Sequence, residues 1–275
     1  MNALTSSTTA RDVMALFKIT DQARKEYRKW EADIRYKETV VPHVLRHRTE
    51  AVYQLTPRDV AAACNATKDR GGHALASIKK ETVERIQEIN DWNPAFAFSH
   101  VFHHIVETVG DIPTWRQLTK FINQDPTGIK MLGEPVRRVQ EQYSSRHGAR
   151  LIEDAVQWRL GNAYYSFLRE LHVLTHMRSH GLDVCVHPLA DALFRVDAWH
   201  GRHIFCLYVG NVKYRNDHAG RKKEAEKILG GPNGPFTFET INLPRATEYG
   251  KVHLASETDL EARIRVLLRE GNEAQ

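Results

Sequence analysis

Hydrophobic positions recur at helical spacing through the first 150 residues. From residue 10 to residue 37 the chain is charged and amphipathic, with an apolar side chain at about every third or fourth position. Thr56-Pro57 is typical of a helix start, and Gly71-Gly72 is expected to end the helix that begins there. Further helices are predicted over residues 74–89, 95–109, 115–123 and 134–145. The pattern predicts an all-helical region over residues 1–150.

The hydrophobic pattern changes in the second half of the chain. One long helical pattern covers residues 151–180 and ends at Gly181, and strand-like runs follow over residues 183–187, 192–198 and 203–208. His200-Gly201 is expected to form the hairpin tip between the last two runs. A helix at 221–229, a fourth strand at 236–243 and a closing helix at 260–270 complete the order. We therefore predict an α/β domain over residues 151–275, with the order α-β-β-β-α-β-α.

The composition is that of an ordinary globular protein, with 41% hydrophobic and 27% charged residues. No apolar run approaches the roughly 20 residues that a membrane helix needs, and the first residues do not resemble a signal peptide. The three cysteines are scattered and form no CxxC pair, which argues against a structural zinc site. We expect a cytoplasmic protein with reduced thiols and no membrane partner.

The positive charge is concentrated in the first half. Residues 1–150 contain 23 Lys and Arg against 18 Asp and Glu, whereas residues 151–275 contain 16 of each, so the formal net charge of +5 lies in the first half. An anionic partner, nucleic acid before membrane, is expected there. Residues 55–63 with the helix that follows, and residues 113–118 with 136–139, resemble helix-turn-helix pairs, and Arg137 and Arg138 would then contact DNA. A small helical bundle with solvated charged faces would show the same pattern.

The candidate chemistry lies at the end of the strand-like run 203–209, where Asn211-Val212-Lys213 follows. Asn211 and Lys213 are two residues apart and therefore share one face of a strand. A buried ammonium needs a counter-charge, and Glu170, Asp191 and Asp197 are the candidate acids upstream. Carboxylates from a helix and a strand that converge on a lysine are what metal-dependent phosphodiester cleavage needs.

The hairpin register decides between the two aspartates. With a two-residue turn at His200-Gly201, Asn211 faces position 190, beside Asp191. Asp197 then faces a position near Ile204, more than about 20 Å from Asn211. Asp191 is therefore the first choice, and Asp197 becomes the ligand only if the second strand slips or bulges.

This order of elements, with these residues, resembles the PD-(D/E)XK nuclease superfamily over about residues 151–245. Glu170 stands at the acidic position of the first helix, Asp191 at that of the second strand, and Asn211-Val212-Lys213 at the third-strand motif. The sequence departs from the pattern twice, because Ala190 replaces the usual proline and Asn211 replaces an acid. The resulting amide-X-Lys variant is similar to that of transposon-encoded end-cleaving nucleases.

The resemblance implies a restriction-endonuclease-like core and a Mg²⁺-dependent DNA endonuclease in which Mn²⁺ can substitute. Glu170, Asp191 and the carbonyl of Val212 would hold the metal, with the side-chain oxygen of Asn211 nearby. Lys213 would orient the attacking water. His172 and His176 are expected at the rim of the site. A basic cluster would contact phosphates beside the cut: Arg215, Arg221, Lys222 and Lys223.

Two alternatives remain open at this point. The protein can be a catalytically silent DNA-binding or assembly protein that has a nuclease-like fold, with Asn211 marking the loss of turnover. It can also be a nuclease that is active only within a multi-protein complex for transposition, defence or genome processing. Two cuts on a duplex would favour a homodimer or a partner protein, although the sequence shows no coiled-coil heptad run.

Overall fold

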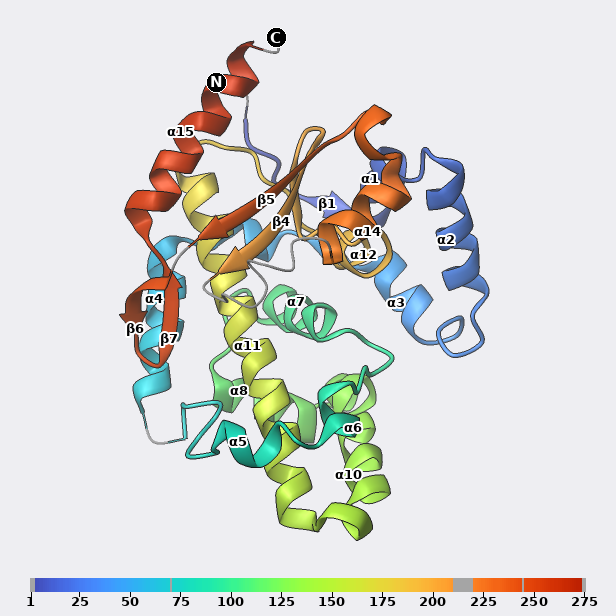
Figure 1. Cartoon of the computed structure of the whole chain (residues 1–275), viewed down its shortest axis with the longest axis vertical. Coiled ribbons are helices and arrows are strands. Elements are labelled where there is room, and N and C mark those ends of the chain that lie inside the picture. Colours follow the sequence, from blue (N-terminus) through green and yellow to red (C-terminus); the bar gives the residue numbers. More distant parts are fainter. Residues whose placement is uncertain (1–2, 70, 210–219, 244, 274–275) are drawn as a thin grey trace. The chain divides into compact units, whose positions relative to one another are not determined.

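The computed structural model describes residues 3–69, 71–209, 220–243 and 245–273, and it shows a mostly helical α/β protein with small sheets (Figure 1). The chain forms two compact units. The first unit contains Met1–Val60, Arg169–Glu248 and His253–Gln275, and the second contains Ala61–Leu168 and Tyr249–Val252. The assignment of functions to residues 1–150 and 151–275 stays a prediction.

The N-terminal part of the first unit contains three helices, α1 (Ala10–Phe17), α2 (Asp21–Ala32) and α3 (Val40–Arg46). Thr9 caps α1 in a capping box with Asp12, and Thr20 caps α2, so the pattern over residues 10–37 is divided between two helices. Two short strands, β1 (Thr8–Thr9) and β2 (Arg48–Thr49), pair antiparallel. The prediction that residues 1–150 are all-helical is therefore wrong at these strands.

The sheet of the first unit has the order β3-β4-β5. The strands β3 (Ala198–His200) and β4 (His203–Val209) form an antiparallel hairpin. The strand β5 (Thr237–Leu243) lies parallel to β4, and the helix α14 (Gly220–Leu229) precedes it in the chain between the two strands. The two strands and the helix between them were predicted from the hydrophobic pattern and are confirmed; the parallel pairing of β4 with β5 is a finding of the structure.

The first two predicted strands of the second half are wrong. Residues 183–187 contribute only a single bridge, from Cys185 to Trp199, and the start of the run 192–198 belongs to helix α12 (Pro188–Phe194). The Nδ1 atom of His187 accepts a hydrogen bond from the Leu189 amide and caps this helix, and Arg195 ends it with a φ of 60°. A short apolar run does not by itself distinguish a buried strand from a buried helix.

The core of the first unit forms around Phe17, which is fully buried. Its ring lies 5.6 Å from that of Phe194, 5.3 Å from that of Trp199 and 5.6 Å from that of Phe236. These rings come from α1, α12, β3 and the approach to β5. One aromatic side chain therefore holds α1 against α12 and the sheet.

The C-terminal part adds elements that the pattern did not predict. After β5 come β6 (Arg245–Tyr249) and β7 (Val252–Ala255), which pair as a two-stranded sheet. The helix α15 (Glu257–Glu273) follows as expected, although it is longer than predicted.

The second unit is helical and forms around Tyr164, which is fully buried and donates a hydrogen bond to the carbonyl of Pro113 (2.8 Å). Tyr164 belongs to the long helix α11 (Ala149–Ser179), whose residues from Arg169 onward belong to the first unit. The other helices lie in sequence before it: α4 (Pro57–Asn65), which begins in the first unit, α5 (Lys80–Val83), α6 (Gln87–Asn90), α7 (Phe98–Val109), α8 (Trp115–Gln124), α9 (Pro126–Gly128) and α10 (Glu134–His147).

The two predicted helix-turn-helix pairs differ in outcome. The helix expected over residues 74–89 is broken into α5 and α6, because the backbone at Ile86 leaves the helical region. The second pair contains two full helices, α8 and α10. They are joined by α9 and a π-helical turn over Ile129–Gly133. Among the described residues, no helix is both long enough and apolar enough to cross a membrane.

We expect Phe17→Ala to destabilise the first unit by about 3–5 kcal/mol. The substitution leaves a cavity among three aromatic rings, and these rings cannot move together to fill it. Urea unfolding followed by circular dichroism measures the loss. Ile34→Ala is the control, since Ile34 is 91% exposed and its truncation should change the stability by less than about 0.5 kcal/mol. Equal effects of the two substitutions would contradict the role of Phe17.

Candidate active site

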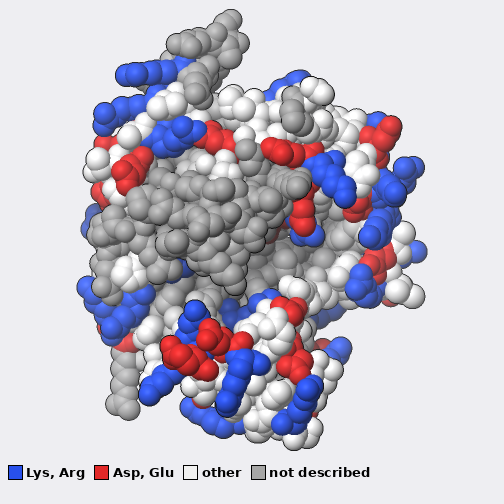
Figure 2. Space-filling model, in the orientation of Figure 1, with Lys and Arg blue, Asp and Glu red and all other residues white. Residues whose placement is uncertain are grey.

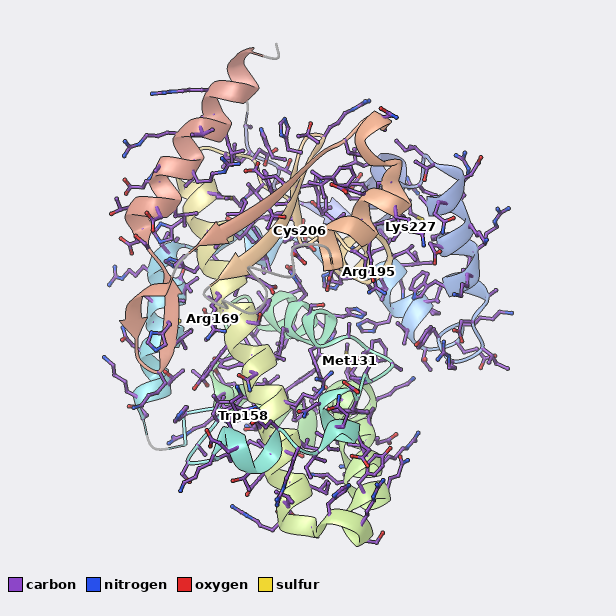
Figure 3. The ribbon with its side chains drawn as sticks, viewed as in Figure 1. Met131, Trp158, Arg169, Arg195, Cys206 and Lys227 are labelled. Carbon is purple, nitrogen blue, oxygen red and sulfur yellow. The ribbon has the colours of Figure 1, made fainter. Side chains whose placement is uncertain are left out.

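The carboxylates of Glu170 and Asp197 lie within each other's electrostatic field. Glu170 belongs to the part of α11 in the first unit, and Asp197 directly precedes β3. The pairing Ala198↔Phe205 places Asp197 opposite Cys206 when it is continued by one residue. Figure 3 labels Cys206 on β4 and Arg169, the neighbour of Glu170 on α11. The two acids thus come from a helix and from the start of a hairpin.

A backbone hydrogen bond fixes the carboxylate of Asp197. The amide of Leu207, on β4, donates to Oδ2 of Asp197 at 3.0 Å. The hairpin register, continued beyond Ala198, would bring Val196 opposite Leu207. The Val196 amide instead donates to the carbonyl of Ala190 (3.1 Å). The side chain of Asp197 therefore accepts the hydrogen bond of the Leu207 amide, which has no backbone acceptor on the neighbouring strand.

The pKa of Asp197 is raised well above its usual range. The main cause is desolvation by the surrounding protein, and the second is the negative charge of Glu170, while the Leu207 amide acts in the opposite direction. Two carboxylates in a poorly hydrated setting are unfavourable unless a proton or a cation lies between them.

The prediction that Asp191 lies on the second strand, opposite Asn211, is wrong. Asp191 belongs to helix α12 and has no place in the hairpin register. The hairpin tip is also displaced: His200 pairs with His203, so that Gly201 and Arg202 form the turn. The register used to prefer Asp191 over Asp197 therefore does not apply. Asp197, the alternative acid, is the one that the structure brings into the field of Glu170.

Several predicted site residues lie outside the described part of the chain. Asn211, Val212, Lys213 and Arg215 fall within residues 210–219, which the structure does not describe. Arg221, Lys222 and Lys223 fall in the first turn of α14. Arg137 and Arg138 belong to α10, where Arg138 forms an ion pair with Glu134 at 3.4 Å. The convergence of the acids with Lys213 and the DNA contacts therefore stay predictions.

The two carboxylates fit a hard divalent cation in the chemistry of their donors, because Mg²⁺ and Mn²⁺ prefer oxygen ligands. They do not form a complete site by themselves. Among the described residues, no group of three or more His, Cys, Asp or Glu side chains could hold a metal ion. Further ligands would come from water, from substrate or from residues 210–219, where the sequence places Asn211 and Val212.

The two histidines of α11 that were expected at the rim of the site, His172 and His176, are buried. The Nε2 atom of His172 donates a hydrogen bond to the carbonyl of Ala255 (3.2 Å), and burial lowers its pKa to about 4. The ring of His176 lies 4.4 Å from that of His172, and burial lowers its pKa as well. His172 is therefore a neutral packing residue between α11 and the end of β7.

Comparison with known proteins finds no protein-family model that matches the chain, and neither a curated protein nor a solved structure that matches it.

The raised pKa of Asp197 predicts a stability that falls with pH. The native protein keeps the proton of this carboxyl to a higher pH than the unfolded chain, so ionisation above the unfolded value of about 3.9 destabilises the native state. In EDTA, Asp197→Asn should therefore gain stability over the wild type as the pH rises from 4 to 8. Urea unfolding at several pH values measures this difference. Asp259→Asn, at an exposed acid of α15, is the control, and a pH-independent difference for Asp197→Asn would refute the assignment.

Proposed function

We propose that the protein is a Mg²⁺-dependent DNA endonuclease in which Glu170 and Asp197 hold the metal. The observation that carries the proposal is the pair itself: one acid on a long helix and one at the start of a hairpin, each in the field of the other. A pair of this kind is unfavourable without a positive counter-charge, and a hard cation bound by two carboxylates is the usual centre of phosphodiester cleavage.

The order of elements supports the same proposal. Apart from helix α12, which lies between α11 and β3, the order is a long helix (α11), an antiparallel hairpin (β3–β4), a crossover helix (α14) and a strand parallel to β4 (β5). The resembled nuclease superfamily has this order. The first strand of that pattern is reduced here to the bridge between Cys185 and Trp199. The fold-level likeness raises the expectation of a nuclease, but the function depends on the site.

Each residue of the proposed site has a separate task. The Leu207 amide holds the Asp197 carboxylate in one orientation, and Glu170 approaches from α11. Lys213 follows four residues after Val209, the last residue of β4, and would hold and orient the attacking water or stabilise the charge on the phosphate. The bound metal would lower the pKa of a water molecule and neutralise phosphate charge.

Asn211 distinguishes this site from one with three acids. An amide at this position supplies an oxygen but no negative charge. The proposed site therefore has two carboxylates, Glu170 and Asp197, and we expect weak metal affinity and one metal rather than two. Mn²⁺ is also suited to carboxylate, carbonyl and water oxygens, so it is expected to support cleavage as well.

The three cysteines are compatible with a cytoplasmic location for this enzyme. Cys64, Cys185 and Cys206 are buried thiols that form no disulfide. Free thiols persist in reducing compartments.

We expect the wild type to cleave plasmid or single-stranded DNA with Mg²⁺ or Mn²⁺. Glu170→Gln, Asp197→Asn and Lys213→Ala should each lower the rate by roughly 100-fold or more, because each removes a metal ligand or a charge at the phosphate. Gel assays of nicking and linearisation measure the rate, and Asp259→Asn is the matched control. Asp191→Asn separates the two aspartates, and it should cleave close to the wild-type rate.

Three results would overturn the proposal. Cleavage by Asp197→Asn at the wild-type rate would remove Asp197 from the site, and loss of cleavage in Asp191→Asn alone would return Asp191 to it. Binding of DNA by the wild type without cleavage in either metal would favour a silent DNA-binding protein or a nuclease that needs a partner protein. Addition of cell extract to that reaction distinguishes these two cases.

A further inference from the structure

The solvent face of helix α2 is strongly basic. Arg24, Lys25, Arg28 and Lys29 are exposed, whereas Ala23 and Tyr27 are buried on the opposite side. Side chains three and four residues apart share one face of a helix, so the four cations form one continuous surface. Lys and Arg side chains, with some acids among them, gather over α2 in the space-filling view (Figure 2).

The acids of this segment leave three of those cations without an ion pair. Glu26 accepts a hydrogen bond from the Gln22 amide (2.7 Å), and Glu31 accepts one from the Tyr27 hydroxyl (2.9 Å). Asp21 pairs with Arg24 at 2.8 Å, and Asp33, just beyond the helix, pairs with Arg35 at 2.6 Å. Among the residues that the structure describes, no acid lies within ion-pair distance of the three remaining cations, Lys25, Arg28 and Lys29.

On other helices of the chain some exposed cations lie one turn from an acid and pair with it. Arg138 pairs with Glu134 at 3.4 Å on α10, and Arg265 pairs with Glu261 at 3.3 Å on α15. Such pairs neutralise a helix surface, although each contributes little to stability. On α2 the acids instead bind neutral donors or the flanking arginines, so three neighbouring positive charges stay available to an external anion.

The helix α2 is attached to the crossover helix of the proposed nuclease core. The hydroxyl of Thr20 donates to the carbonyl of Ile228, on α14, at 2.7 Å and also caps α2 by accepting from the Ala23 amide. The helix α14 connects β4, on which Asp197 is anchored, to β5. Both helices belong to the first unit and lie together in Figure 1. The basic surface thus has a fixed attachment to the core that carries the two carboxylates.

We propose that Lys25, Arg28 and Lys29 form a binding surface for the phosphate backbone of duplex DNA beside the cleavage site. The identity of the anion as DNA rests on the proposed nuclease function. Contacts of this kind position a duplex without reading its sequence, and they make binding strongly dependent on salt.

The test is the binding of a fluorescein-labelled duplex oligonucleotide in EDTA, measured by anisotropy over a range of salt concentrations. We expect Lys25→Gln with Lys29→Gln to weaken binding by about tenfold or more and to reduce the slope of log K against log salt by about two. Arg265→Gln with Arg269→Gln is the matched control. These arginines are exposed, lie one turn apart on α15 and belong to the same unit.

Two outcomes would overturn the proposal: no duplex binding by the wild type, or equal losses in the two double variants. Circular dichroism and urea unfolding establish that both variants are folded. Because EDTA prevents cleavage, the result does not depend on the nuclease reaction. Loss of binding confined to the α2 variant supports the surface even if the wild type fails to cleave DNA, and that failure would count against the nuclease proposal alone.

Discussion

The hydrogen bond from the Leu207 amide to Asp197 is the interaction on which the candidate site depends. This bond lies at the end of the β3–β4 hairpin. If the hairpin continued, the Leu207 amide would donate to the backbone carbonyl of Val196 instead. A buried amide needs an acceptor, and a carboxylate is a strong one. The bond therefore completes the sheet and at the same time fixes an acid in the field of Glu170. Desolvation and that neighbouring charge outweigh the stabilising amide, so the structure keeps an acid that favours a proton or a cation.

The strongly periodic elements could be predicted from the sequence. The helix that became α11, the strand β4, the crossover helix α14 and the strand β5 each have a long and consistent hydrophobic pattern. Residues 188–198 could not be predicted in the same way. Leu189, Leu193 and Phe194 suit a buried strand as well as a buried helix, and only the tertiary contacts of α12 with Phe17 and the cap from His187 decide between them. The short strands β6 and β7 have too few residues to show a period.

The location of the candidate site depended on one such detail. Glu170 was identified because it flanks the apolar face of a long helix, and this inference did not need the hairpin register. The choice between Asp191 and Asp197 did need it. A turn at Gly201-Arg202 instead of His200-Gly201 changes every cross-strand partner, and the helix α12 removes Asp191 from the strand altogether. The bond between a side chain and the Leu207 backbone has no sequence signature, since any aspartate near a strand end could form it.

The count of charged residues has a similar limit. It gives the net charge of a segment but not the place on the surface where unpaired charges lie. The surplus of positive charge in residues 1–150 is spread over both compact units. Part of it is neutralised where it occurs, as at Arg138 and Glu134 on α10. On α2 the acids are as frequent as on many surface helices, but Glu26 and Glu31 bind Gln22 and Tyr27 instead of lysines. The net charge of a segment is therefore a weaker guide to an anion-binding surface than the hydrogen-bond or ion-pair partner of each acid in that segment. By that criterion Lys25, Arg28 and Lys29 on the helix attached to α14 are stronger candidates for phosphate contact than Arg138 of the predicted helix-turn-helix pair, which already has a counter-ion.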